Sequence, residues 1–238
     1  MLKQLDDLSS SFSKVSVAGV VRVGASSICL ELLAAVSIET SRTMPLVSYE
    51  VEVERAARLL DRLELRKIDI ALVSGPVEAH KFRARSLGFD RMVWVASARI
   101  LQERLTAPES ERLRGLPIWC VHPDSFYWSA ATAGLREQGA DMVRLNAINN
   151  TMGVARVVAA GAGIGLVSER LVRDELASGA LVPVPDLGSC DAVEISVVSM
   201  AESNSSIVDE VIDAAVASSL QPAAPGRLRA PLSNDAHQ

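Results

Sequence analysis

The sequence predicts an α/β protein made of two successive units, and three observations indicate it. Between residues 19 and 74, strand-like and helix-like apolar patterns alternate in the order strand, helix, strand, helix, strand. The alternation begins afresh after Ser97. A final apolar segment over 193–200 precedes a helical pattern over 207–220, and we expect both to return to the first unit. Alternation of this kind implies parallel strands joined by right-handed helical crossovers.

In the first unit, the segment GVVRVG at 19–24 predicts a strand with alternating burial, and Ser26 and Ser27 follow it as a turn and helix cap. Apolar residues then recur on one helical face up to Ile38, and Pro45 ends that connection. The remaining expected elements are a strand over 47–53, a helix over 56–65, a buried strand over 69–74, an extended segment over 84–90 and a strand over 92–96.

The second unit is expected to repeat the same kind of alternation. Its helix over 126–138 begins after Asp124 or Ser125, either of which can cap it. The other expected elements are short helical pieces over 100–105 and around Leu113 and Leu116, strands over 118–121 and 142–145, a helix over 169–178 closed by Gly179, and an extended segment over 181–182.

The stretch NNTMGVARVVAAGAGIGLVSE at 149–169 organises the second unit. Its opening Asn-Asn-Thr can cap a helix, and valines at helical spacing give that helix an apolar face with Arg156 on the wet side. Gly161 and Gly163 end the helix, because the chain there needs backbone angles that other residues resist, and a buried strand follows. The helix start therefore lies at the open end of a sheet, where it attracts anions. A dinucleotide fingerprint has its glycines after a strand and before a helix, so the order found here argues against nucleotide binding.

Composition and charge exclude several classes of protein. With 238 residues, 49% of them hydrophobic, the chain can bury a large core, and its longest uncharged apolar run, over 157–167, is shorter than the ~18 residues that span a bilayer. Residues 1–15 are polar and of mixed charge, so no secretory segment is expected there. Cys29, Cys120 and Cys190 are widely spaced, which suits a reducing cytoplasm and neither a disulfide framework nor a zinc site. With a net charge of −5 and no dense Lys/Arg cluster, this chain by itself should bind nucleic acid poorly.

Polar loops in both units lie where parallel sheets bind ligands, beyond the carboxyl ends of the strands. The residues that we expect to contact a ligand there are Ser26, Ser27, Arg55, Ser74, Gly75, His122, Ser125, Phe126, Asn149, Asn150 and Thr151. Plainer roles stay open for them: helix caps, worth about 1 kcal/mol each, for the short polar residues, a solvated helix residue for Arg55, and a turn residue for His122. Phe126 and its aromatic neighbours suit a core or pocket wall better than a nucleobase platform, since no basic cluster flanks them. Helix starts and short polar side chains favour a small anionic ligand.

Catalysis and metal binding find little support in the sequence. Residues 24–28 are GASSI, which is not a G-x-S-x-G elbow. His80, His122 and His237 lack metal-ligand spacing, and no HExxH or paired-carboxylate pattern is present. Cys29 has no visible resolving partner, so we expect structural burial for it. We therefore expect no enzymatic activity, no metal and no cofactor.

Three segments stand out by their order and spacing. They are GVVRVGASSICLELLAAV at 19–36, RLLDRLELRKIDIALVSGPV at 58–77 and MGVARVVAAGAGIGLVSERLVRDELASGALVPVP at 152–185. Together they resemble the effector-binding domain of LysR-type transcriptional regulators. The resemblance runs from about Gly19 to Leu220, and it rests on the ordered set rather than on any single motif.

The resemblance implies two Rossmann-like subdomains joined by two crossover strands, as in type 2 periplasmic binding proteins, with an effector in the cleft between them. Ser27, Asn149 and Asn150 match the family's polar pocket positions. The chain departs from the family at Glu54 and Arg55, where a capping Ser or Thr is common. The implied division is 1–18 as the end of a linker helix and linker, 19–97 with 194–220 as subdomain I, 98–193 as subdomain II, and 221–238 as a disordered tail.

The resemblance also implies partners. Members of the family form homodimers, or tetramers when full length, and bind DNA through an N-terminal winged helix-turn-helix that we expect to be missing from this chain. Its absence would reflect either an excised regulatory fragment, which we favour, or a natural truncation. Side-by-side antiparallel pairing transmits effector binding, and our hypothesis places that interface on the helices over 56–65 and 126–138. We expect a cytoplasmic protein that contacts a small effector and its own copy but no membrane.

Two alternatives share the same two-lobed fold. A solute-binding protein of a transporter would use the same cleft but requires export, so the upstream coding sequence separates it from a regulator. An enzyme, for example a dehydratase of the prephenate type, would need a catalytic constellation that the sequence lacks. A turnover screen with candidate carboxylates would distinguish it from a binding protein.

Overall fold

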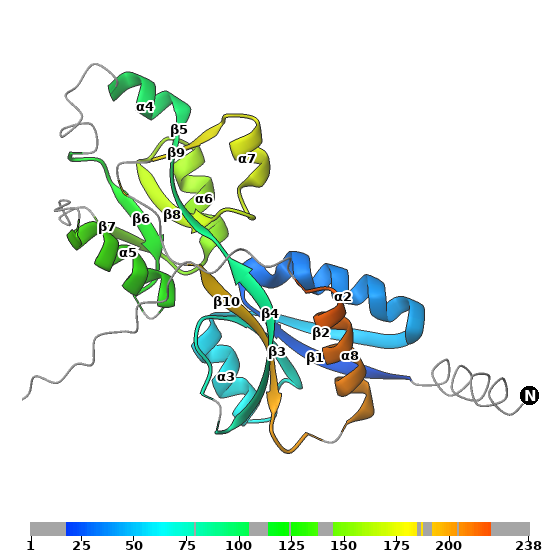
Figure 1. Cartoon of the computed structure of the whole chain (residues 1–238). Helices are drawn as coiled ribbons and strands as arrows, with labels where there is room; N and C mark the ends of the chain where they lie inside the picture. Colours follow the sequence, from blue (N-terminus) through cyan, green and yellow to red (C-terminus); the bar gives the residue numbers. More distant parts are fainter. Residues whose placement is uncertain are drawn as a thin grey trace, which may run out of the picture.

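Lobe I, formed by the described residues of 18–90 and 193–219, is built on a five-stranded sheet with the order β2-β1-β3-β10-β4 (Figure 1). The computed structural model describes residues 18–78, 80–104, 114–123, 125–137, 145–184, 187, 192–203 and 205–219. The strands of this sheet are β1 (Ala18–Ala25), β2 (Leu46–Val53), β3 (Ile70–Ser74), β4 (Phe82–Asp90) and β10 (Val193–Met200). β1 pairs in parallel with β2 and β3, as predicted, whereas β10 runs antiparallel to β3 and β4.

Helices cover both faces of this sheet. They are η1 (Ser27–Cys29), α2 (Leu30–Thr43), α3 (Ala56–Glu64) and α8 (Ser206–Ala217). Leu32 of α2 and Val211 of α8 belong to one buried cluster, whereas Leu59 and Leu63 of α3 belong to a second. Apolar residues at helical spacing thus fix α2 and α8 on one face and α3 on the other. The return of the C-terminal strand and helix to the first unit is confirmed.

Lobe II, formed by the described residues of 92–184, has a second five-stranded sheet with the order β7-β6-β8-β5-β9 (Figure 1). Its strands are β5 (Met92–Ser97), β6 (Ile118–Val121), β7 (Leu145–Ile148), β8 (Ile164–Ser168) and β9 (Leu181–Pro183). Its helices are α4 (Ala98–Arg104), α5 (Phe126–Glu137), α6 (Thr151–Ala159) and α7 (Arg173–Ala177). β6 pairs in parallel with β7 and β8, and β5 runs antiparallel to β8 and β9.

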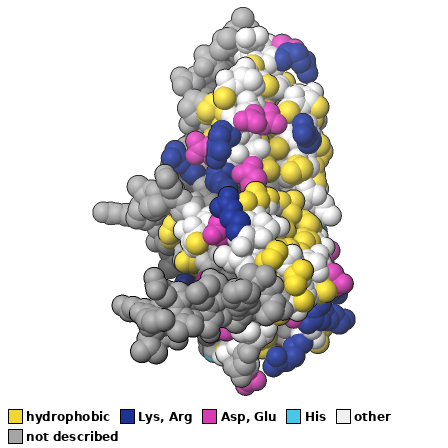
Figure 2. Space-filling view, turned by 90° about the vertical axis from the view of Figure 1, so that its right-hand side faces the viewer, with side chains coloured by type: hydrophobic (Ala, Val, Ile, Leu, Met, Phe, Trp, Pro, Cys, Tyr) yellow, Lys and Arg dark blue, Asp and Glu magenta, His cyan; other side chains and the backbone are white. Residues whose placement is uncertain are grey.

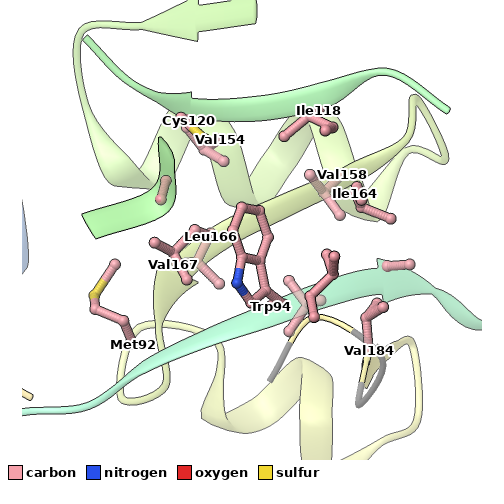
Figure 3. Packing of buried hydrophobic residues seen from close by; sticks show 14 of the residues in the cluster. Met92, Trp94, Ile118, Cys120, Val154, Val158, Ile164, Leu166, Val167 and Val184 are labelled. Atoms are coloured by element: carbon pink, nitrogen blue, oxygen red, sulfur yellow. The ribbon is translucent and has the colours of Figure 1, made fainter. Parts of the chain in front are cut away.

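Trp94 lies at the centre of the lobe II core (Figure 3). Its side chain is 1% exposed and lies among Leu166 of β8 and Val154 and Val158 of α6. Its indole N–H has no hydrogen-bond partner within the described residues. The buried aromatic side chain packs β5, β8 and α6 together, so it fixes the start of α6 relative to the sheet.

Gly163 shapes the connection from α6 to β8. Its φ is +136°, and a Cβ there would lie 2.0 Å from the carbonyl oxygen of Pro117. Gly161, with φ +86°, precedes it. Both glycines therefore end the helix through positive φ angles, as the sequence predicted, and Gly163 also admits the close approach of a neighbouring backbone.

The chain passes between the lobes twice. β4 ends at Asp90 and β5 begins at Met92, so Arg91 carries the first crossing. Val193 opens β10 and pairs with Asp90, so the returning chain lies beside the outgoing one. In Figure 1, β4 and β5 form an almost continuous ribbon from one lobe to the other. Residues 92–97, expected in subdomain I, thus pair with the sheet of lobe II.

Two expected elements differ from the structure. β7 begins at Leu145 and extends to Ile148, because Leu145 pairs with Ile118 in the parallel register, whereas a strand was expected over 142–145. Residues 142–144 lie outside the described residues. The helix expected over 169–178 is reduced to α7, because the chain first turns at 169–172, where the Ser168 hydroxyl accepts a hydrogen bond from Leu171 N at 3.3 Å. The expected linker helix before residue 18 and the expected tail over 221–238 also lie outside the described residues.

Candidate functional site

A cavity of about 270 Å³ lies between the two lobes. Lobe I contributes the residues that follow β1, β2 and β3, and lobe II contributes those that follow β6 and β7. The residues expected from the sequence that line it are Ser26, Ser27, Arg55, Ser74, Ser125, Phe126, Asn149, Asn150 and Thr151. The carboxyl ends of parallel strands from both sheets thus meet at one hollow, and contact with a ligand there stays a prediction.

Gly75 and His122 were expected in the site but do not line the cavity. Gly75 donates its N–H to the carbonyl of Glu194 at 2.9 Å. It lies against Phe126, and Phe126 rather than Gly75 lines the cavity. His122 lies beside the cavity, and its Nδ1 is 3.1 Å from a guanidinium nitrogen of Arg55. That contact joins the two lobes, since Arg55 precedes α3 and His122 follows β6.

The two helices of lobe I that begin at the cavity, η1 and α3, have no side-chain caps. Ser26 occupies the cap position of η1, but its hydroxyl lies 3.1 Å from the thiol of Cys29 and caps no backbone N–H. Arg55 precedes α3 and provides no side-chain cap either. Ala56 and Ala57, the first residues of α3, line the cavity. The first N–H groups of an uncapped helix are available donors, so the lobe I wall is suited to an anion.

The two helices of lobe II that begin at the cavity, α6 and α5, have side-chain caps. The Asn150 side-chain oxygen accepts a hydrogen bond from Gly153 N at 2.7 Å. The Ser125 hydroxyl accepts one from Trp128 N at 3.2 Å and donates one to the carbonyl of His122 at 2.7 Å. Capping of α6 and α5 by these residues is therefore confirmed, while Asp124, the other expected cap of α5, lies outside the described residues.

Two buried groups at or beside the cavity are Tyr127, which was expected as a core or pocket-wall residue, and Cys29, which was expected as a structurally buried thiol. Tyr127 is 6% exposed, and its hydroxyl, near Ser74, has no formed hydrogen bond within the described residues. Burial raises its pKa well above the ordinary value. Burial also raises the pKa of the Cys29 thiol to about 12, so this thiol stays protonated at neutral pH and is a poor nucleophile. The expected structural burial of Cys29 is confirmed, since 1% of it is exposed.

Most of the remaining wall is apolar, and apart from Tyr127, which was expected as a core or pocket-wall residue, it was not predicted from the sequence. Its residues are Ile28, Leu30, Val53, Ala56, Ala57, Val121, Tyr127 and Met152, together with the charged Glu54. Most of them belong to the same strand ends and helix starts as the polar residues. Their closeness in sequence to those polar residues is the signal that could have found them.

Neither a metal cluster nor a membrane-spanning helix occurs in the part of the chain that the structure describes. Within the described residues, no three His, Cys, Asp or Glu side chains gather closely enough to hold a metal ion. The helices in the described ranges include none with the length and apolar character needed to cross a bilayer.

Comparison with known proteins gives the family. The model of the LysR substrate binding domain matches residues 15–219. No curated protein sequence matches the chain. Solved structures similar to it include the reduced form of the regulatory domain of OxyR2 from Vibrio vulnificus (17% identity, 84% of this chain and 96% of that chain, TM-score 0.67). They also include the CrgA regulatory domain from Neisseria meningitidis (21% identity, 84% and 98%, TM-score 0.68) and a full-length variant of AphB (19% identity, 90% and 74%, TM-score 0.65).

At these identities the solved structures show the fold alone, which is that of the type 2 periplasmic binding proteins, as expected from the sequence. The family match covers most of the chain. The chain therefore belongs to the LysR substrate-binding domain family, the effector-binding domains of LysR-type transcriptional regulators.

Proposed function

We propose that this chain senses a small anionic effector in the cavity between its lobes and passes that signal to DNA binding through the assembly of dimers. The single observation that carries the proposal is a cavity whose walls come from the strand ends of both sheets. A ligand there contacts both lobes at once. Its binding can shift the equilibrium between open and closed lobes by as much as its affinities for the two arrangements differ.

The expected chemistry of the effector follows from the two walls. The uncapped starts of η1 and α3 offer backbone N–H donors and the positive end of a helix dipole, which favour a carboxylate or a similar anion. Ile28, Leu30 and Phe126 offer apolar contacts nearby. The volume of about 270 Å³ fits a metabolite of modest size. We therefore expect a small carboxylate with an apolar body.

The dimer interface is proposed on α2 and β2. Leu59 and Leu63 of α3 are buried on the sheet and face away from any partner, although Leu65 at the end of the expected helix over 56–65 is 65% exposed. The hypothesis of an interface on the helices over 56–65 and 126–138 therefore stays a prediction. Ile38 of α2 and Leu46 of β2 are 58% and 57% exposed. α2 and β2 extend to the right in Figure 1, and Figure 2, seen from that side, shows hydrophobic side chains gathered between charged ones. An apolar edge strand of this kind favours pairing with a second copy.

The remaining partners follow from the family. We propose that DNA contact is made by a separate DNA-binding domain of the regulator, as membership of the family implies. We place the protein in the cytoplasm, where a transcription regulator acts and where the free Cys29 and Cys120 stay reduced.

Solution scattering at high protein concentration tests the dimer: a monodisperse monomer would contradict it.

The effector site is tested by a thermal-shift screen of small carboxylates, followed by calorimetric titration of those that raise the melting temperature. Ser27→Ala should weaken binding about tenfold, because a hydrogen bond to a charged group is worth about 1.5 to 3 kcal/mol. Asn149→Ala tests the opposite wall, and it is preferable to Asn150→Ala, which would also remove the cap of α6. Ser178→Ala, an exposed serine after α7 that lies outside the cavity and the proposed interface, is the matched control. Unchanged affinity in both Ser27→Ala and Asn149→Ala would overturn the assignment.

A further inference from the structure

A buried carboxylate lies where both connections between the lobes meet. Asp90 is the last residue of β4, directly before the first crossing, and it pairs with Val193, where the returning strand begins. It is 2% exposed, and neither carboxylate oxygen has a formed hydrogen bond within the described residues. A buried polar group left without partners needs an explanation, because native structures satisfy nearly all of them.

Groups from both lobes surround this carboxylate. Cys29 of η1 and Glu31 of α2 interact electrostatically with it from lobe I. From lobe II, Tyr127 of α5 interacts with it, and so do three residues at the end of β8, namely Ser168, Glu169 and Arg170. Arg91, the next residue in the chain, is paired with Glu169 at 3.1 Å. Arg170 is therefore the cation that can serve as the counter-ion of Asp90.

Arg170 also holds the lobes together. Its guanidinium lies 3.3 Å from the carboxylate of Glu31, and this ion pair joins the turn after β8 to the first turn of α2. Burial raises the pKa of Asp90 to about 6, against the partial compensation given by Ser168 and Arg170. Both protonation states of this carboxyl are thus accessible near neutral pH.

The two protonation states make different demands on Arg170. A protonated Asp90 is neutral and leaves Arg170 with Glu31. An ionised Asp90 is a buried charge that needs either Arg170 or water, and each requires a change at the junction. Arg170 must leave Glu31, which releases the contact between the lobes, or the lobes must separate and admit solvent.

We propose that Asp90 makes the hinge sensitive to pH: its protonation holds the lobes in the arrangement described here, and its ionisation favours their opening. The proposal goes beyond effector sensing, since it needs no ligand. A solvent-exposed aspartate has a pKa of about 3.9. If the open form exposes Asp90, acidification from about pH 8 to about pH 5 shifts the opening equilibrium toward the closed form by about tenfold, and the full shift of about 100-fold is reached only below about pH 4.

Small-angle scattering of the ligand-free chain between about pH 5 and about pH 8 tests the proposal. The radius of gyration should rise with pH, with a midpoint at about 6. Asp90→Asn, which is neutral at every pH, should stay compact throughout. Asp174→Asn removes an exposed carboxylate of α7 in lobe II and should keep the response of the unmodified chain.

One variant separates Asp90 from the histidine that bridges the lobes at the cavity. His122→Gln removes that imidazole and should keep the pH response if Asp90 causes it. A constant radius of gyration in the unmodified chain would overturn the proposal. So would a response that persists in Asp90→Asn.

If Asp90→Asn fails to fold, NMR of the chain with ¹³C-labelled aspartate decides in its place. One carboxyl that titrates at about 6 together with the change in scattering supports the proposal. Titration of every aspartate below about pH 5 overturns it.

Discussion

The two walls of the cavity are built from the same parts but differ in how the helices begin. In lobe I, η1 and α3 start without side-chain caps, because the Ser26 hydroxyl lies against Cys29 and Arg55 has no capping oxygen. In lobe II, Asn150 and Ser125 cap α6 and α5. The same loop position therefore leaves free backbone donors on one side and satisfied ones on the other.

This difference assigns separate tasks to the lobes. A wall with available donors can gain hydrogen bonds from an anion, whereas a wall that satisfies its own donors keeps its shape with or without a ligand. Lobe II is also fixed behind the wall, where Trp94 packs against α6 and Gly163 lies on Pro117. We infer that lobe I supplies most of the polar recognition and lobe II supplies a rigid surface against which the lobes close.

The largest expected effect is the loss of stability when the rigid lobe II is disturbed at Gly163. Gly163→Ala should lower the free energy of unfolding by roughly 3 kcal/mol or more, because alanine resists φ +136° and its Cβ would meet the Pro117 carbonyl. Chemical denaturation measures this. Gly179→Ala is the matched control: its φ is +74° with no atom within 4 Å, so only the backbone term remains, about 1 kcal/mol. Equal losses in the two variants would contradict a rigid contact at Gly163.

The next largest expected effect is a gain in stability from a substitution at Asp90, where the chain crosses between the lobes. Asp90→Asn should raise the free energy of unfolding near pH 7 by on the order of 2 to 3 kcal/mol. The folded pKa of about 6 lies above the unfolded value, so the folded state binds the proton more tightly. The contribution of the protonated Asp90 carboxyl to the free energy of unfolding is thus present at low pH and is lost as pH rises through about 6. Denaturation at several pH values should show that the free energies of unfolding of Asp90→Asn and of the unmodified chain become similar at about pH 4. A difference independent of pH would contradict the shift.

Most of the fold could be predicted from local sequence patterns. Alternating strands and amphipathic helices gave both units, and the return of β10 followed from one apolar segment over 193–200. The path at Gly161 and Gly163 was also predictable, since glycine tolerates positive φ. β7 was misplaced because the start at Leu145 is set by its register with β6, which is a tertiary property.

The site was predictable in position but not in detail. Strand ends locate the cavity, yet whether a serine or asparagine caps its helix depends on what else its side chain meets, as Ser26 and Cys29 show. Asp90 illustrates the same limit. In the sequence it is the polar last residue of an expected extended segment over 84–90, and only the meeting of both crossings with the end of β8 buries it.

The smallest expected effect tests the comparison of the two walls directly. Asn150→Ala should lower the free energy of unfolding by about 1 kcal/mol, because Gly153 N loses its acceptor. Ser27→Ala should change stability by less than about 0.5 kcal/mol, because η1 has no side-chain cap to lose. Denaturation without ligand measures both. Equal losses would mean that lobe I satisfies its helix starts as lobe II does, and anion binding by free donors would then lose its physical basis.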